Sequence, residues 1–231
     1  MLGLAILTGV IFGGYKISDS RKFQLFGEII HRVDTQQKVV ALTFDDGPTK
    51  MTQEVLELLK ELDVKATFFI TGRELEENKE EGEKIVLAGH ELGNHSYTHK
   101  RMVFKSLLFT KEEIEFTNNL IREVGYQGDI HFRPPYGKKL VLLPYYLMRS
   151  GKKTIMWDVE PESYPEISSS SEEIINHVVE NVNPGSIILL HVMYESRRES
   201  LNSIEGIINT LKAEGYSFLT ISELLEYQSP L

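Results

Sequence analysis

The 231-residue sequence lacks cysteine, so disulfide bonds, thiolate metal ligands and a cysteine nucleophile are excluded. It also lacks an excess of positive charge, because 34 acidic and 25 basic side chains give a net charge of −9 at pH 7. Proteins that neutralise phosphates usually carry a basic surface, so we expect no nucleic-acid partner. The length and the 41% share of hydrophobic residues indicate one globular domain with a real core, which we expect to be a monomer.

A long membrane-spanning run is also missing from the N-terminus. Residues 2–15 (LGLAILTGVIFGGY) carry no charge, but this run is shorter than the roughly 20 residues that cross a bilayer. It fits the apolar core of an export signal, although no basic residue precedes it and no clear cleavage site follows. A buried first strand or helix is the alternative, which Gly9, Gly13 and Gly14 within the run disfavour. We therefore expect residues 1–16 to be an export signal or a short membrane anchor, with the protein outside the cytoplasm, either secreted or attached through residues 2–15.

From residue 38 onward, short β-branched or aromatic runs alternate with amphipathic stretches. The expected strands are residues 39–44, 66–70, 130–133, 154–159, 186–191 and 217–221. The expected helices are residues 51–62, 80–88, 111–124, 138–150, 171–181, 200–212 and a last one from residue 222. Such alternation implies parallel strands joined by helices, and about seven repeats favour a distorted (β/α) barrel over an open sheet, although alternation alone does not separate them. We expect residues 17–37 to be a connector and residues 38–231 to be the domain.

Polar side chains fall at the carboxyl ends of four expected strands. Asp45 and Asp46 follow VVALTF directly, Arg133 ends another strand, Asp158 lies within the next, and His191 closes SIILLH. Active sites of parallel α/β folds are built at that edge. The coincidence therefore predicts an active site where these strands end.

Two local patterns suggest a metal site, although each has an ordinary alternative. Adjacent carboxylates at Asp45 and Asp46 allow one to bind a metal while the other acts on a water, but DDGP also favours a turn. His95 and His99 are spaced to lie on one side of a helical turn, but seven histidines make a chance pair plausible. Two imidazoles and one carboxylate would form a three-ligand site with open positions.

Four motifs together resemble the polysaccharide deacetylase (NodB-homology) family, which is carbohydrate esterase family 4. They are TFDDGP at residues 43–48, HSYTH at 95–99, RPPYG at 133–137 and LLH at 189–191, in the family's order and at similar spacing. The resemblance runs from about Lys38 to the C-terminus. It implies a NodB-type barrel and a metal-dependent hydrolase that removes acetyl groups from N-acetylglucosamine units, in peptidoglycan or chitin-like chains.

The resemblance also implies roles for single residues. A divalent metal, most often zinc, with cobalt, nickel or manganese as alternatives, would be held by Asp46, His95 and His99. Asp45 would be the general base, Arg133 would keep it ionised, and His191 would protonate the departing amine. The acetyl pocket and groove would be shaped by Pro135, Tyr136 and Leu189, and the backbone N–H of Tyr136 would help to stabilise the oxyanion.

The family's fourth motif, which lies between RPPYG and LLH and reads WDVEPESY at residues 157–164, departs from its usual pattern here. Relatives have an Asp-Trp pair where this chain has Ser163 and Tyr164. In those relatives a carboxylate from this segment supports the acid histidine, and Ser163 carries no such charge. Tyr164 could still stack on a sugar ring. Three other carboxylates could support His191, and sequence does not choose among Asp158, Glu160 and Glu162.

Three functions remain open on the sequence. The first is an N-acetyl polysaccharide deacetylase. The second uses the same site to hydrolyse a different bond, as an O-acetyl esterase on xylan or an amidase on a small molecule. The third is a noncatalytic glycan-binding protein, which the altered fourth motif favours and the retained polar residues of the other motifs disfavour.

Overall fold

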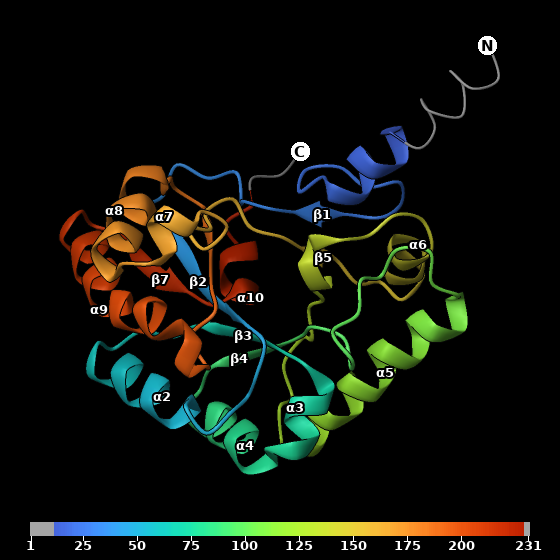
Figure 1. The fold of residues 1–231 in the computed structure, drawn as a ribbon, viewed down its shortest axis with the longest axis horizontal. Coiled ribbons are helices and arrows are strands. Elements are labelled where there is room, and N and C mark those ends of the chain that lie inside the picture. The colour runs from blue at the N-terminus through green and yellow to red at the C-terminus, as the bar shows by residue number, and fades with distance from the viewer. Residues whose placement is uncertain (1–11, 229–231) are drawn as a thin grey trace.

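The computed structural model describes residues 12–228 (Figure 1). The expected export signal or anchor therefore lies largely outside the described residues, and only its last residues join a helical stretch at 12–19. Within residues 12–228, no helix combines the length and apolarity needed to cross a membrane.

The centre of the fold is the parallel strand β2 (Val39–Asp45), which is buried along its whole length. On one side it pairs with β6 (Ile187–Leu190), and it also pairs with β3 (Thr67–Ile70) and β7 (Ser217–Leu219). β4 (Glu91–Asn94) pairs with β3, so the order is β4-β3-β2-β6 with β7 beside β2. The β-branched and aromatic residues of VVALTF suit a strand covered on both faces.

Single bridges extend this sheet into a distorted barrel. β1 (Ile29–Ile30) pairs in parallel with β5 (Thr154–Ile155). Phe132 forms parallel bridges to the last residue of β4 and to the first residue of β5. Val159 bridges to β6, and its carbonyl accepts the N–H of Leu189 at 2.9 Å. The segment from β5 to Val159 thus joins the two ends of the ladder, although only individual residues pair there.

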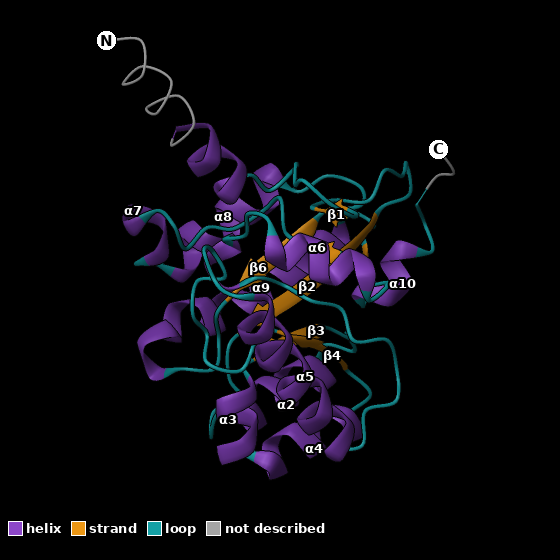
Figure 2. Cartoon of the chain, turned by 90° about the vertical axis from the view of Figure 1, so that its right-hand side faces the viewer, coloured by secondary structure: helices purple, strands orange, loops and turns teal. Residues whose placement is uncertain are grey.

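Helices cover the outside of the strands (Figures 1 and 2). They are α2 (Thr52–Glu61), α3 (Gly72–Glu77), α4 (Lys79–Leu87), α5 (Leu107–Glu123), α6 (Leu142–Arg149), α7 (Pro165–Ser168), α8 (Ser171–Asn181), α9 (Arg198–Ala213) and α10 (Ile221–Leu225). Their apolar residues recur at helical spacing, as in α9, where Leu201, Ile204, Ile208 and Leu211 are buried in the main core. Short 3₁₀ turns at Pro135–Gly137 and Glu195–Arg197 complete the described elements.

Several strands differ from the sequence-based expectation, and the expected strand at residues 154–159 is reduced to β5 and the bridge at Val159. β4 was not expected, because Glu91, Gly93 and Asn94 have low strand propensity. Its backbone is nevertheless fully buried, and a Cβ on Gly93 would lie 2.4 Å from the Phe69 ring, so glycine allows the close approach of β3. The expected strand at residues 130–133 pairs only at Phe132, since the two prolines that follow lack the N–H needed to extend a ladder.

The expected connector, residues 17–37, is partly built into the fold. β1 lies within it, Ile30 and Val33 are buried in the core, and Val33 donates its N–H to the Gly185 carbonyl at 2.9 Å. A two-residue strand leaves too short a pattern for sequence reasoning to detect. The folded part therefore begins before Lys38.

Gly185 provides a test of this packing. Its φ is +82°, and a Cβ there would lie 2.0 Å from the Val33 carbonyl oxygen. We expect Gly185→Ala to lower the free energy of unfolding by at least about 2 kcal/mol, because the clash adds to the backbone strain. Gly151 also has a positive φ but no atom within 4 Å, so Gly151→Ala should cost only about 1 kcal/mol. Denaturant unfolding measures both, and equal losses would show that residues 29–33 do not pack against Gly185.

Candidate metal centre and active site

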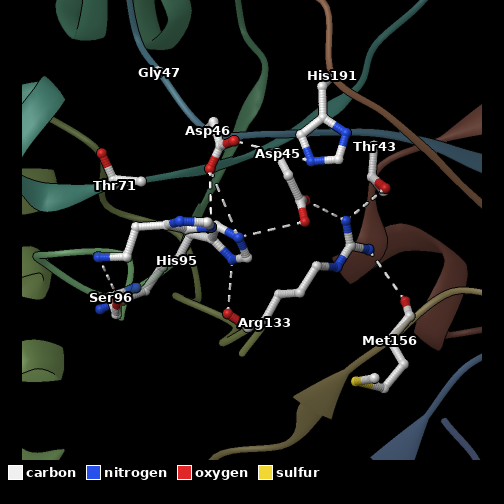
Figure 3. A network of polar contacts seen from close by, with 12 residues as sticks. Thr43, Asp45, Asp46, Gly47, Thr71, His95, Ser96, Arg133, Met156 and His191 are labelled. Atoms are coloured by element: carbon white, nitrogen blue, oxygen red, sulfur yellow. Dashed lines mark hydrogen bonds and ion pairs between the residues drawn. The ribbon is translucent and has the colours of Figure 1, made fainter. Parts of the chain in front are cut away.

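The two adjacent aspartates lie where β2 ends (Figure 3). Asp46 has φ +72°, a left-handed conformation that aspartate tolerates better than most residues. Its carboxylate therefore points differently from that of Asp45. His95 follows β4 and His191 follows β6, so the structure brings side chains from three strand ends to one place.

Asp46, His95 and His99 form a set that could hold a metal ion. One potential ligand atom from each residue lies within 4.8 Å of the others. The Oδ1 atom of Asp46 is 3.3 Å from His99 Nε2 and 3.8 Å from His95 Nε2. This oxygen is buried without a hydrogen-bond partner among the described residues. A buried carboxylate oxygen left unpaired is costly, and a divalent cation would satisfy it.

The ring of His95 is oriented for such a role. Its Nδ1 lies 2.8 Å from the Arg133 carbonyl, which can only accept, so Nδ1 carries the proton and Nε2 presents its lone pair to Asp46. Burial lowers the pKa of His95 below its ordinary value, and this effect exceeds the opposing influence of Asp45 and Asp46. The ring is thus neutral, which is the form that binds metals.

The HSYTH segment is a loop, and the expected helical turn is wrong. Ser96 and His99 have φ values of +66° and +55°, and the Ser96 hydroxyl accepts the N–H of His99 at 3.1 Å. Glu113 of α5 accepts the N–H groups of Tyr97 and Thr98 at 3.0 and 2.8 Å. Two left-handed residues and one buried carboxylate therefore bring the histidines together. Such strain is common at functional sites.

Arg133 is fully buried beside Asp45. Its Nη1 donates to Asp45 Oδ1 at 2.6 Å and to Thr43 Oγ1 at 2.8 Å, and its Nη2 donates to the Met156 carbonyl at 3.1 Å. The guanidinium also lies 4.0 Å from the centre of the Phe69 ring. Burial raises the pKa of Asp45, but the charge of Arg133, aided by the nearby His191, outweighs it and holds the pKa below its ordinary value. Asp45 is therefore ionised.

Glu162 is the carboxylate that supports His191. It accepts from His191 Nδ1 and, at 3.0 Å, from the His191 backbone N–H, and the Ser200 hydroxyl also donates to it. Burial lowers the pKa of His191, but the hydrogen bond and charge of Glu162 outweigh this and raise it to about 9. His191 Nε2 lies 3.9 Å from Asp46 Oδ2, so a protonated imidazole faces the metal set.

The other two candidate carboxylates are engaged elsewhere. Asp158 accepts from the Ser186 hydroxyl at 2.7 Å and from the Ile187 N–H at 2.8 Å. Glu160 accepts from the Ser163 hydroxyl at 2.6 Å. The hydroxyl of Ser163, which replaces the usual aspartate, is therefore hydrogen-bonded to Glu160, and it is Glu162 that pairs with His191.

A cavity of about 650 Å³ opens onto these groups. Tyr136 and Leu189 line it, as expected, together with Trp157. Pro135 is buried and is not among the lining residues. Tyr164 also lies outside the lining, with its ring 5.5 Å from that of His177, so the structure does not bring it to the cavity.

Several lining residues were missed by the sequence analysis. Asp19 and Arg21 line the cavity from the expected connector, and the Arg21 guanidinium lies 4.6 Å from the centre of the Trp157 ring. Tyr194, three residues after His191, also lines the cavity, and its hydroxyl donates to Glu74. No motif signalled these positions, because each depends on a contact between distant segments.

Glu74 holds the chain directly after the candidate ligand Asp46. Its carboxylate accepts the Gly47 N–H at 2.8 Å and the Thr71 hydroxyl at 2.7 Å, in addition to the Tyr194 hydroxyl. These bonds fix the turn that aims the Asp46 carboxylate.

Replacing Glu162 should change the protonation of His191. In Glu162→Gln the charge of Glu162 is gone while burial remains, so we expect the pKa of His191 to fall from about 9 towards its ordinary value. NMR titration of labelled histidine, with chelator present, measures it. Glu160→Gln is the matched control and should leave the pKa near 9. An unchanged value in Glu162→Gln would contradict the assignment.

Replacing Glu74 should weaken metal binding without removing a ligand. We expect Glu74→Gln to lower the affinity for zinc by roughly 10- to 100-fold, as is typical when a group that orients a ligand is lost. Among the described residues, the carboxylate of Glu76 on the same helix accepts a hydrogen bond only from the Tyr97 hydroxyl, so Glu76→Gln is the control. Competition with a chromophoric chelator measures both, and equal affinities would refute the positioning role.

The polysaccharide deacetylase family model matches residues 32–155, beginning within the expected connector. A peptidoglycan-N-acetylglucosamine deacetylase of Bacillus cereus is 32% identical over 203 residues, which are 87% of this chain and 95% of that protein. Both matches point to the same family that the four sequence motifs resemble.

Two solved structures share the fold. A peptidoglycan N-acetylglucosamine deacetylase in complex with 4-naphthalen-1-yl-N-oxidanyl-benzamide gives a TM-score of 0.80 at 28% identity, covering 86% of this chain and 94% of that chain. A family 4 carbohydrate esterase pseudoenzyme from Bacillus anthracis gives 0.76 at 30% identity, covering 87% and 70%. The predicted distorted barrel is thereby confirmed, and the chain belongs to the polysaccharide deacetylase family.

Proposed function

We propose that this deacetylase removes N-acetyl groups from N-acetylglucosamine units of peptidoglycan or chitin-like chains outside the cytoplasm. The observation that carries the proposal is the pairing of an ionised Asp45 and a protonated His191 beside one three-residue metal set. A hydrolase needs a base for its water and an acid for its leaving group, and the two environments separate these roles.

Zinc is the metal that the donor set favours. Two imidazoles and one carboxylate with open positions are typical of catalytic zinc sites, and Asp46, His95 and His99 would supply them. When bound there, such an ion would polarise the acetyl carbonyl and make the nucleophilic water more acidic. Cobalt, nickel and manganese accept similar ligands and are alternatives to be tested.

The chain's own residues would move the protons. Asp45 takes a proton from the water whose oxygen attacks the acetyl carbon, and Arg133 keeps Asp45 ionised beforehand. His191 gives its proton to the amide nitrogen as the carbon–nitrogen bond breaks, so acetate and a free amine are released. Glu162 keeps His191 charged for this step. Tyr136 and Leu189 would form the wall against the acetyl group, with the Tyr136 N–H as an oxyanion donor.

The location outside the cytoplasm rests on sequence. The uncharged run at residues 2–15 supports export or attachment, and peptidoglycan and chitin-like chains are polymers that an exported enzyme would meet. We propose that the catalytic unit acts as a monomer, since one chain supplies the base, the acid and all three residues of the metal set.

The substrate assignment is tested by acetate release from a panel of glycans. Metal-loaded protein should release acetate from peptidoglycan fragments or chitooligosaccharides faster than from acetylated xylan or small amides. A preference for acetylated xylan would support the O-acetyl esterase instead. No acetate from any member, with zinc bound, would favour a noncatalytic glycan-binding protein.

Substitutions should separate the two aspartates. Asp45→Asn keeps the metal set, so we expect normal zinc content with acetate release lowered by about 10²- to 10⁴-fold. Asp46→Ala removes a ligand, so zinc content and activity should both be lost. Asp34→Asn, at an exposed position, is the control. Zinc analysis beside the acetate assay distinguishes them, and full activity in Asp45→Asn would exclude Asp45 as the base.

A further inference from the structure

Acidic residues are absent from three long stretches of this acidic chain. Residues 1–18, 92–111 and 130–157 contain no aspartate or glutamate, although the whole sequence has 34 of them and a net charge of −9. The second and third stretches contain ten of the 25 lysines and arginines, and residues 1–18 contain one, Lys16. Such segregation indicates that one part of the surface has a different partner from the rest.

The three stretches meet at one place in the fold. An apolar groove of about 540 Å³ is lined from all three, by Gly14, Tyr15, Ser18, Arg101, Val103, Phe104, Lys138 and Leu140. In Figure 1, α5 and α6 lie on the right-hand side of the molecule and the helical residues 12–19 lie above them. We call this region, made of residues 12–18, 100–108 and 138–142, the basic apolar face.

Large apolar side chains of this face are exposed to solvent. Phe104 is 91% exposed, and its φ of +55° is unusual for an aromatic residue. Leu108, Phe12 and Tyr15 are 65%, 61% and 58% exposed. Exposed apolar groups that gather in this way mark interaction surfaces.

Cations accompany these apolar groups. Lys16 lies 5.5 Å from the Phe12 ring centre and Lys138 lies 5.1 Å from that of Tyr15, while Arg101 and Lys105 flank Phe104 in sequence. Asp19, the first carboxylate of the chain, is paired with Lys138. The face therefore has a positive charge around an apolar centre.

We propose that the basic apolar face docks onto a bilayer of anionic phospholipid. Phenylalanine, tyrosine and leucine can enter the interface while lysine and arginine meet the lipid phosphates. The face is also continuous in sequence with the uncharged residues 2–15, which suit the same apolar phase. A soluble polyanion would satisfy the cations but leave the apolar groups in water.

Docking in this way brings the metal set near the membrane surface. The loop that carries Phe104 starts directly after His99, and a hollow of about 580 Å³ is lined by both residues and by Tyr136. The metal set would therefore bind its substrate close to the bilayer. Docking itself does not depend on the proposed catalytic activity.

A tryptophan at position 104 tests the contact directly. The chain has one tryptophan, Trp157, which is only 7% exposed, so Phe104→Trp adds a distinct surface signal. With the full chain and phosphatidylglycerol vesicles, we expect blue-shifted emission and quenching by brominated acyl chains. Leu87→Trp, at an 86% exposed position on α4, is the control and should show neither. Because Tyr15 and Phe104 line the same groove, the charge variants below separate docking of this face from attachment by residues 2–15 alone.

The charge requirement is tested in the same variant. Adding Arg101→Gln and Lys105→Gln to Phe104→Trp should weaken the vesicle affinity read from this signal by about 30-fold. Each cation lost near an anionic surface weakens the affinity by roughly fivefold. Lys60→Gln with Lys65→Gln is the matched control and should change little. Phosphatidylcholine vesicles should give a weak signal. The proposal is overturned if Phe104→Trp is quenched no more than Leu87→Trp, or if soluble polyphosphate binds the face while vesicles leave the emission unchanged.

Discussion

The buried pair of Arg133 and Asp45 is the interaction on which the rest of the site depends. A guanidinium taken wholly out of water must find partners, and Arg133 finds the Asp45 carboxylate, Thr43 and the Met156 carbonyl. Its own backbone carbonyl fixes the tautomer of His95. One residue thus keeps the carboxylate ionised and aims a candidate metal ligand, and losing it would leave a buried charge unpaired.

On the opposite side of the site, a buried carboxylate supports a cation, whereas Arg133 is a buried cation that supports a carboxylate. Glu162 is almost fully buried and holds His191 protonated, whereas Arg133 holds Asp45 deprotonated. Separate buried partners therefore lower the pKa of Asp45 and raise the pKa of His191, although both residues lie near Asp46. Glu162 comes from the altered fourth motif, so that motif keeps a supporting carboxylate at a different position. The retained acid and base distinguish this arrangement from a merely glycan-binding surface.

Much of this site could be predicted because its residues sit at strand ends within compact motifs. Asp45, Asp46, His95, His99, Arg133 and His191 are brought together as the alternating pattern and the family resemblance indicated. Glu162 could not be chosen over Asp158 and Glu160, since the choice depends on how one loop meets α9. β4 was missed because its glycine and polar residues have low strand propensity and form a strand here only through burial. The position of Tyr164 outside the cavity lining could not be predicted, because it depends on the packing of its ring against α8.

The central claim is that the two adjacent aspartates have separate roles, set by the turn at Asp46 and by the Arg133 contact. A crystal of the zinc-loaded protein, with anomalous scattering recorded at the zinc edge, tests it most directly. The account predicts one zinc ion bound by Asp46, His95 and His99, with Asp45 still paired to Arg133 and outside the coordination shell. A zinc ion bridging both aspartates, or bound through His191 in place of His99, would contradict it.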